Sequence, residues 1–232
     1  AAVAMLFGAT ACGSDGSRAA VLSTGDSSLR GAITVSAASS LSGAFETLSR
    51  QFARRHPGTA VDVNAGSSAA LVAQIEQGAP ADVFASADTT NMALLVDAKR
   101  TLGAPTVIAH NRLTIVTKPG NPKRIATLAD LTHGAVVALC AATVPCGKYA
   151  AQILDAAGLS IPETSITRDA DARTTIGAVA NGDAEAAIVY VTDARAAGTS
   201  VVTVEFPADE NVIATSPMAA SRPSSAPGLA PA

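Results

Sequence analysis

Four short segments of the chain place small or hydroxyl residues where a strand ends and a helix is expected to begin. They are Ala38-Ser39-Ser40, Gly66-Ser67-Ser68, Val144-Pro145-Cys146-Gly147 and Asp171-Ala172-Arg173. The first turn of a helix leaves N–H groups without partners and carries a partial positive charge. Several such turns that converge on one cleft would bind an anion without cationic side chains. A single serine at such a position is more often a helix N-cap, so only the four segments together indicate an anion site.

The residue patterns of common enzymes are missing from the sequence. The three histidines are His56, His110 and His133. They form no H-x-x-x-H or H-E-x-x-H zinc pattern, and there is no G-x-S-x-G nucleophile elbow. Gly147-Lys148 is not a P-loop, because alanine stands at position 142 where that motif needs glycine. Cys146 is a candidate thiolate nucleophile at a helix start, but no histidine or carboxylate pattern accompanies it. We therefore expect a binding protein without a cofactor, not an enzyme.

Strands and helices alternate along the chain. Apolar residues recur at i, i+4, i+7 and i+11, at Leu41, Phe45, Leu48 and Phe52. They predict one face of an amphipathic helix, which Pro57-Gly58 ends. Further helices are expected at about 66–78, 89–98, 146–157 and 173–181. Strands are expected at about 33–37, 61–63, 82–85, 106–109, 112–117, 135–140, 186–190 and 200–205.

Two breaks in this alternation indicate two lobes. Strands follow one another without a helix near 106–117, and a second break lies near 200–215. Elsewhere the alternation predicts parallel sheets with right-handed crossovers. We expect an α/β protein with lobe 1 at 32–110 plus 202–215 and lobe 2 at 111–201, joined by two crossover strands that form a hinge. A ligand would lie in the cleft, at the carboxyl ends of the strands.

Composition excludes several classes of protein. The 232 residues are 48% hydrophobic and 15% charged, which excludes an intrinsically disordered chain. The formal net charge of -3 gives no electrostatic footprint for nucleic acid. Three cysteines are too few for a disulfide-scaffold miniprotein.

The two ends of the chain differ from its body. Residues 1–12 are an apolar run too short to span a bilayer and fit the core of an export signal. Ala9-Thr10-Ala11-Cys12-Gly13 resembles a bacterial lipobox, which makes Cys12 the candidate lipidation site, although lipoboxes usually have leucine at the position of Ala9. Residues 13–31 have the composition of a flexible linker. Residues 216–232 hold a proline every four to six residues and are expected to be a disordered tail.

Several motifs resemble the molybdate-binding proteins of ABC importers, over about residues 32–215. The motifs are Gln74-Ile75-Glu76-Gln77-Gly78-Ala79-Pro80-Ala81-Asp82-Val83-Phe84-Ala85-Ser86-Ala87-Asp88, Ala38-Ser39-Ser40-Leu41-Ser42-Gly43-Ala44-Phe45, Gly66-Ser67-Ser68, Val144-Pro145-Cys146-Gly147-Lys148-Tyr149 and Ile188-Val189-Tyr190-Val191-Thr192-Asp193-Ala194. The resemblance implies a type II periplasmic-binding-protein fold that closes on one tetrahedral dianion, molybdate or tungstate.

The resemblance also implies which residues hold the metal as its oxyanion. Carried over residue by residue, the donors are Ser40, Ser68, Cys146, Ala172 and Tyr190. The serines and the tyrosine would donate through their hydroxyls, and Cys146 and Ala172 through their backbone N–H groups. Ser39 and Ser67 are the alternates because each serine has a serine neighbour. The family usually has valine where Ala172 stands, a change that a backbone donor tolerates.

Cys140 and Cys146 flank the implied ligand turn. In an exported protein this pair is a candidate disulfide, with two free cysteines as the alternative. The bond would stabilise the fold by about 2 kcal/mol and make the turn more rigid.

The sequence thus predicts an extracytoplasmic receptor, a monomer that delivers the anion to an ABC permease. Its expected place is the outer face of the cytoplasmic membrane or the periplasm, held by an N-terminal lipid anchor. Family members usually continue with helices that pack on the first lobe, and here the Pro-rich tail replaces them. The alternatives are a receptor for sulfate or thiosulfate, a truncated non-functional homologue and, less favoured, a cysteine-dependent enzyme.

Overall fold

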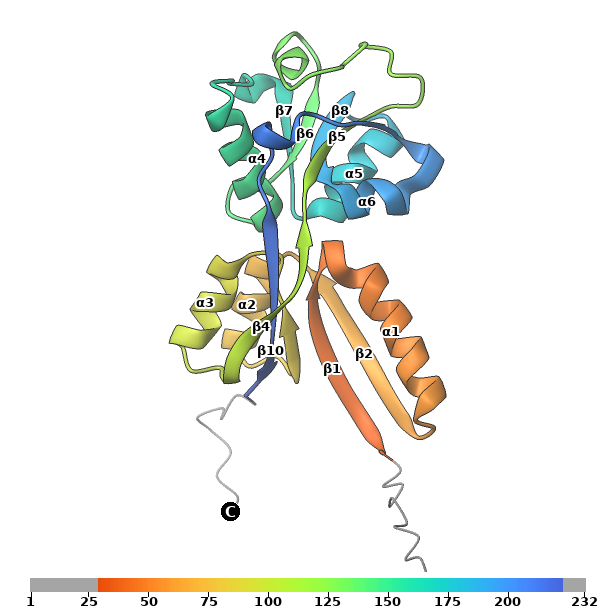
Figure 1. Cartoon of the computed structure of the whole chain (residues 1–232), viewed down its shortest axis with the longest axis vertical. Helices are drawn as coiled ribbons and strands as arrows, with labels where there is room; N and C mark the ends of the chain where they lie inside the picture. Colours follow the sequence, from red (N-terminus) through yellow and green to blue (C-terminus); the bar gives the residue numbers. More distant parts are fainter. Residues whose placement is uncertain (1–28, 223–232) are drawn as a thin grey trace, which may run out of the picture.

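The computed structural model describes residues 29–222, which form two five-stranded sheets, each with helices packed against it (Figure 1). The first sheet has the order β2-β1-β3-β10-β4 and the second the order β7-β6-β8-β5-β9. The chain passes from the first sheet to the second between β4 and β5 and returns between β9 and β10. The predicted two-lobed α/β architecture with two crossings is therefore confirmed.

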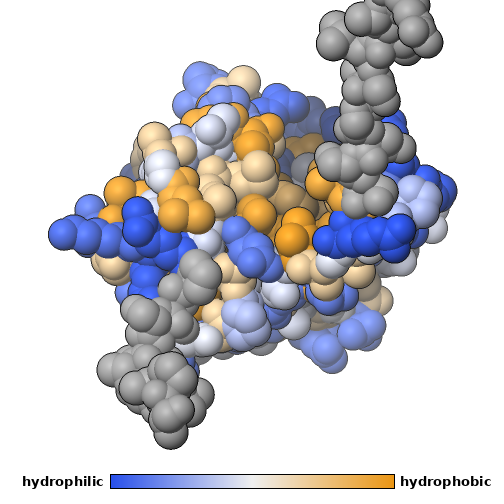
Figure 2. Space-filling model, turned by 90° about the horizontal axis from the view of Figure 1, so that it is seen from below, coloured by the Kyte–Doolittle hydropathy of each residue, from blue (hydrophilic) through white to orange (hydrophobic). Residues whose placement is uncertain are grey.

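The first sheet consists of β1 (Gly31–Ala38), β2 (Thr59–Gly66), β3 (Val83–Ala85), β4 (Thr101–Asn111) and β10 (Ala214–Ser221). Strands β1, β2 and β3 are parallel, and β10 runs antiparallel to both β3 and β4. Helices α2 (Ser68–Glu76) and α3 (Thr89–Asp97) cover one face, where Phe84 and Ala219 pack among their apolar side chains. The other face carries α1 (Ser42–Arg55), which packs on β2. Viewed from below, this lobe shows apolar residues in its middle and hydrophilic residues along both sides (Figure 2).

The second sheet consists of β5 (Leu113–Thr117), β6 (Val137–Cys140), β7 (Ile166–Asp169), β8 (Ala186–Tyr190) and β9 (Val202–Val204). Its helices are α4 (Pro145–Ala156), α5 (Ala172–Asn181) and α6 (Val191–Ala197). Alternate residues of β8 enter different cores, with Ile188 on the side of Ile153 in α4 and Val189 on the side of Val179 in α5. This sheet is therefore covered on both faces, as expected for a mostly parallel sheet.

Short 3₁₀ segments complete the described chain. They are Ser39–Leu41, Ala129–Thr132, Glu163–Ser165, Gly198–Ser200 and Ala208–Glu210. The sequence did not predict β7 or α6.

The two crossing segments are bonded to each other between the lobes. The Asn211 side-chain amide donates to the Leu113 carbonyl oxygen at 2.8 Å, and its oxygen accepts from the Leu113 N–H at 3.2 Å. The Asn211 side chain therefore links the two segments that would form the hinge.

Two predicted boundaries are wrong. Residues 202–204 were expected in lobe 1, but they form β9, which pairs with β5 in the second sheet. Residues 216–221 were expected in a disordered tail, but they continue β10 between β3 and β4. Pro217 is tolerated because the register with β4 shifts between Ser216 and Pro217, so the ladder does not need the missing proline N–H.

Several predictions concern residues that the structure does not describe. These are the export signal at 1–12, the lipidation site Cys12, the linker as far as residue 28, and the tail from 223 to 232. Between residues 29 and 222 no helix is long and apolar enough to cross a membrane.

Candidate anion-binding site

A small pocket lies between the two lobes at the carboxyl ends of their strands. The first lobe lines it with Ala38, Ser39, Ser40, Gly66, Ser67, Ser68 and Ala87. The second lobe lines it with Pro145, Cys146, Asp171, Ala172 and Tyr190. The empty volume between these residues is about 200 Å³. The space suits a small ion, not a sugar or a peptide.

The structure brings the predicted ligand residues together. All five donors implied by the sequence line this one pocket, and so do the alternates Ser39 and Ser67. The first lobe contributes two helix starts, that of the 3₁₀ turn before α1 and that of α2. The second lobe contributes the starts of α4 and α5 and the end of β8. The four segments selected for their small residues thus converge in space.

The two neighbouring serines of the second segment have different hydrogen bonds. Ser67 is the N-cap of α2, and its hydroxyl oxygen accepts from the Ala70 N–H at 3.2 Å. Ser68 is fully buried, and its hydroxyl oxygen accepts from the Ala87 N–H at 3.0 Å. Each hydroxyl oxygen thus accepts one N–H bond and keeps its proton for a ligand. The two serines differ in burial, since Ser68 is buried and Ser67 is half-buried, and both stay candidates.

The first segment keeps both serines as candidates. Ser39 and Ser40 form a 3₁₀ turn that leads into α1, and both line the pocket. Ser39 is buried and Ser40 is half-buried. The Ser39 carbonyl oxygen accepts from the Ser42 hydroxyl at 2.7 Å, which fixes the turn.

Two backbone donors come from the starts of α4 and α5. Val144 caps α4 with an extended backbone, Pro145 begins the helix, and Cys146 follows in its first turn. Ala172 is the first residue of α5, which a capping box between Asp171 and Thr174 holds in place. N–H groups in a first turn have no partner inside the helix, so those of Cys146 and Ala172 are available to an anion.

The expected disulfide between Cys140 and Cys146 is present. It ties the end of β6 to the first turn of α4, and the Cys140 sulfur also lies 3.3 Å from the Thr175 hydroxyl of α5. Gly147 is needed at the same turn, because a Cβ there would lie 2.1 Å from the Ala141 carbonyl oxygen. Covalent and steric constraints together fix the Cys146 N–H in position.

The Tyr190 hydroxyl is the most informative group in the pocket. The side chain is 2% exposed, and its oxygen has no hydrogen-bond partner among the described residues. A buried hydroxyl without a partner costs about 1–3 kcal/mol, so a ligand that accepts a bond there would remove the penalty. Burial, with a smaller effect of Tyr149, Asp88 and Asp193, raises the pKa of Tyr190 well above its ordinary value. The phenol is therefore protonated and can donate.

The pocket contains no lysine or arginine among its described lining residues. Its only ionisable side chains are those of Asp171 and Tyr190, besides the disulfide-bonded Cys146. The Asp171 carboxylate accepts from the Thr174 N–H at 2.9 Å and so serves its own helix. The pocket is a cage of neutral donors.

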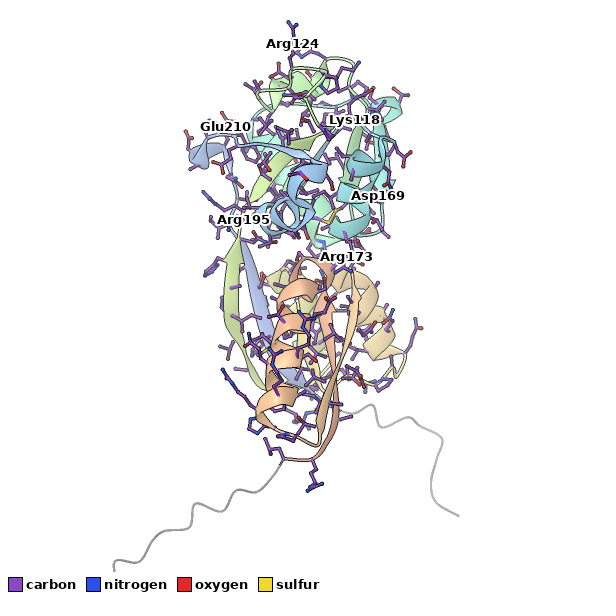
Figure 3. All side chains as sticks on the ribbon, turned by 90° about the vertical axis from the view of Figure 1, so that its right-hand side faces the viewer. Lys118, Arg124, Asp169, Arg173, Arg195 and Glu210 are labelled. Carbon is purple, nitrogen blue, oxygen red and sulfur yellow. A yellow bond between two sulfur atoms is a disulfide. The ribbon has the colours of Figure 1, made fainter. Side chains whose placement is uncertain are left out.

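Cationic side chains of the second lobe instead reach the first lobe beside the pocket. Lys148 Nζ lies 3.8 Å from Asp88 Oδ2, whose side chain is buried. Arg173 Nη2 lies 3.9 Å from Glu46 Oε1 and donates to the Ser42 hydroxyl. Figure 3 shows Arg173 at the junction of the lobes. These two pairs link the lobes beside the pocket.

Sequence reasoning missed a buried carboxyl group next to the site. Asp193 of α6 is 9% exposed, lines a cavity that Arg173 also lines, and has an Oδ2 atom without a partner among the described residues. Burial raises the pKa of Asp193 to about 7, against the opposing effect of Arg173. The one sequence signal for Asp193 was its position in the segment that also contains Tyr190.

Comparisons with known proteins agree with this architecture. A model of the family described as bacterial extracellular solute-binding protein matches residues 33–232. The molybdate-binding protein ModA of Mycobacterium tuberculosis H37Rv is 37% identical over 227 residues, which is 97% of this chain and 85% of that protein. The molybdate-binding protein ModA of Escherichia coli K12 is 32% identical over 191 residues, or 78% of this chain and 74% of that protein.

Solved structures give the same fold. The Azotobacter vinelandii periplasmic molybdate-binding protein superposes with a TM-score of 0.71 and 25% identity, over 82% of this chain and 85% of that one. The sulfate-binding protein SubI from Mycobacterium tuberculosis H37Rv gives a TM-score of 0.71 at 21% identity, over 84% and 77%. The expected periplasmic-binding-protein architecture is confirmed.

The matched family consists of solute-binding proteins, in agreement with the prediction of a binding protein and not an enzyme. Its members are described as extracellular, in agreement with the prediction of export. Because the family model matches residues 33–232 and the mycobacterial relative is 37% identical, the chain belongs to the bacterial extracellular solute-binding proteins.

Proposed function

We propose that this protein is a receptor that captures molybdate or tungstate in the interlobe pocket and delivers it to an ABC import permease. The observation that carries the proposal is the buried Tyr190 hydroxyl, which has no partner among the described residues and lines a pocket of neutral donors.

The donor set suits a small, fully deprotonated oxyanion. Ser68, Tyr190 and either Ser40 or Ser39 offer hydroxyl protons, and Cys146 and Ala172 offer backbone N–H groups. Each such bond to a charged oxygen contributes about 1.5–3 kcal/mol net. An anion that keeps a proton would place a donor against a donor, so the cage favours a dianion with four accepting oxygens.

The relatives favour molybdate over smaller anions. The mycobacterial and Escherichia coli relatives are molybdate-binding proteins, at 37% and 32% identity. The sulfate-binding neighbour at 21% identity shares the fold, and so a sulfate or thiosulfate receptor is the second candidate. The size of the cage would separate these ions, because donors set for long metal–oxygen bonds do not all reach a smaller anion.

The proposal includes the setting of the protein. It acts as a monomer outside the cytoplasmic membrane, anchored through a lipid on Cys12 after removal of the export signal. Lobe closure on the anion is a shift in population between open and closed forms, and the permease would receive the closed form.

Thermal unfolding of the full chain with molybdate, tungstate or sulfate tests the proposal. A ligand that binds only the folded state at a hundred times its dissociation constant stabilises it by about 2.7 kcal/mol. We expect a clear rise of the midpoint with molybdate and tungstate and little change with sulfate. A rise with sulfate alone would favour the second candidate. A cooperative transition that no anion moves would refute the receptor, and the absence of any cooperative transition would indicate the non-functional homologue.

A further inference from the structure

A second space between the lobes, the side cavity, adjoins the anion pocket. Residues 39–44 line it from the first lobe and residues of α5 and α6 line it from the second, and its empty volume is about 1220 Å³. Ser39 and Ser40 line both the side cavity and the anion pocket. The two spaces therefore meet at the 3₁₀ turn that carries these serines.

The two spaces differ in their access to solvent. Every described residue that lines the anion pocket is buried or half-buried. The side cavity is bordered by four exposed residues, which are Gly43, Ala44, Arg173 and Thr192. An anion can therefore reach the pocket from solvent through the side cavity, by passing the turn Ser39–Leu41.

The opposite side of the lobe junction is occupied by an ion pair. Helices α3 and α4 lie on that side, whereas α1, α5 and α6 lie on the side of the side cavity (Figure 1). Lys148 of α4 lies 3.8 Å from Asp88, whose side chain is buried. A fixed carboxylate repels an approaching anion, and the cation there already has a partner. The side cavity is therefore the favoured route.

Arg173 is the one cationic side chain among the described residues that line either space. Its side chain is 60% exposed, and it directly follows Ala172, whose N–H is a candidate donor to the anion. Both residues belong to the first turn of α5. A cation in the first turn of a helix opposes the helix dipole. The stability of α5 therefore does not account for an arginine at this position.

The contacts of Arg173 with the first lobe are exchangeable. Its Nη2 atom donates to the Ser42 hydroxyl, which in turn donates to the Ser39 carbonyl oxygen at 2.7 Å. Its ion pair with Glu46 is long, at 3.9 Å, and exposed ion pairs of this kind are weak. The guanidinium also has further N–H donors in a planar fork that matches an oxyanion. A dianion in the side cavity can therefore replace Glu46 as its partner.

We propose that Arg173 is the entry residue of the receptor: its guanidinium captures the oxyanion in the side cavity and passes it over Ser39 and Ser40 into the neutral cage. This step rests on the proposed function and adds a route and a capturing residue to it. Neutral donors hold an anion at short range but attract it little from a distance, and the formal net charge of -3 repels anions. A cation at the entrance supplies the missing attraction.

Asp193 is the other ionisable side chain that lines the side cavity. It is buried, whereas Arg173 is 60% exposed, so an anion from solvent meets the cation first. Burial raises the pKa of Asp193 to about 7, so its carboxyl group is only partly charged near neutral pH. Asp193 therefore opposes entry less than an ordinary carboxylate would.

Stopped-flow fluorescence with molybdate tests the proposal on the full chain. The chain has no tryptophan, and its two tyrosines are Tyr190, which lines the pocket, and Tyr149, whose ring lies 6.4 Å from that of Tyr190. Tyrosine emission therefore reports occupancy of the pocket. Isothermal titration of molybdate and tungstate gives the affinities at equilibrium.

Arg173→Gln is expected to lower the association rate constant about three- to tenfold at about 0.01 M salt, where the Debye length is about 30 Å. The difference should fall below about twofold at about 1 M salt, where that length is about 3 Å. Arg173→Lys keeps the charge and should restore most of the rate. Arg124→Gln makes the same change in net charge at the far end of the second lobe (Figure 3) and should associate like the wild type.

Glu46→Gln separates capture of the anion from a purely structural role of Arg173. The variant removes the carboxylate that competes for the guanidinium, so the association rate constant should rise about two- to threefold at about 0.01 M salt. If Arg173 only held the lobes closed, the same variant would raise the dissociation rate constant and leave association unchanged.

The outcomes distinguish the entry residue from the receptor. Equal association rate constants of Arg173→Gln and Arg124→Gln at low salt would overturn the entry role and leave the receptor intact. A slower association of Arg173→Gln that high salt does not reduce would overturn it too, because attraction by a charge must be screened. A wild-type protein that shows neither a change in emission nor a heat of binding with molybdate or tungstate would refute the receptor, and the entry role with it.

Discussion

Lys148 of the second lobe and Asp88 of the first lie 3.8 Å apart across the interlobe boundary. Asp88 is the N-cap of α3 and accepts from the Asn91 N–H at 2.8 Å and from the Asn91 side chain at 2.9 Å, so the carboxylate is held in place before Lys148 reaches it. A fixed anion on one lobe and a longer cationic side chain on the other favour the closed form.

Lys148→Met is expected to weaken anion binding two- to fivefold without lowering the thermal midpoint of the anion-free protein. The pair contributes only in the closed form, and partly exposed pairs contribute about 0.2–1 kcal/mol. Isothermal titration gives the affinity, and thermal unfolding gives the midpoint of the anion-free protein. Lys118→Met, at a labelled position on the second lobe away from the pocket (Figure 3), is the matched control. An unchanged affinity would show that the pair plays no part in closure.

Tyr190→Phe is expected to lower molybdate affinity about tenfold to a hundredfold, because one hydrogen bond to a charged oxygen is lost. The same substitution should leave the anion-free protein as stable as the wild type or slightly more stable, since it removes a buried hydroxyl without a partner among the described residues. Titration and thermal unfolding measure the two effects separately. Tyr149→Phe, whose ring lies 6.4 Å from that of Tyr190 outside the pocket, is the control. Destabilisation without loss of affinity would assign Tyr190 a purely structural role.

Gly147→Ala is expected to destabilise the fold by about 1–3 kcal/mol and to weaken anion binding at least tenfold. The new Cβ would meet the Ala141 carbonyl oxygen at 2.1 Å and push the first turn of α4, with the Cys146 N–H, out of position. Gly177→Ala in α5, where a Cβ would meet nothing within 4 Å, should instead stabilise by about 0.5–1 kcal/mol. Denaturant unfolding and titration check both variants. Wild-type affinity in Gly147→Ala would mean that this turn supplies no donor.

Asp193→Asn is expected to make the protein less sensitive to pH. The folded-state pKa of Asp193, raised by burial to about 7, lies above the ordinary value of about 3.9. The folded state therefore binds this proton more tightly, and the resulting stability is present at acid pH and lost as pH rises from about 4 to about 7. Arg173 and Asp171 act on the same carboxyl group in opposite directions.

The variant should therefore be more stable than the wild type at pH 8, by an amount on the order of a few kcal/mol, and the difference should shrink toward pH 4. Denaturant unfolding of both proteins across this range gives the comparison. Parallel curves for the two proteins would show that Asp193 keeps an ordinary pKa.

Local sequence patterns predicted the features that depend on neighbouring residues. Helix starts with serine or glycine, the alternation of elements and the cysteine pair were each readable from a few positions. The period of Leu41, Phe45, Leu48 and Phe52 correctly predicted an amphipathic helix, α1, although Leu48 on its apolar side is 55% exposed. Helical spacing says which side of a helix is apolar, and it does not say whether the rest of the molecule covers that side.

Features that depend on distant residues were not predictable in the same way. The proline at 217 argued against a strand, and only the register shift opposite β4 admits it. The hydrogen bond between the Ser68 hydroxyl and the Ala87 N–H joins residues 19 apart and has no local sequence signal. The unpartnered Tyr190 hydroxyl and the burial of Asp193 depend on how the lobes and α6 pack, which no local pattern encodes.

A crystal structure of the full chain grown with tungstate, with the anomalous signal of tungsten recorded, tests the central claim most directly. We predict one strong anomalous peak in the interlobe pocket, with ion oxygens within hydrogen-bond distance of Ser68 Oγ, Tyr190 Oη and the N–H groups of Cys146 and Ala172. Tungsten bound only outside this pocket, for example at Arg173, would contradict the account, and so would a pocket without tungsten.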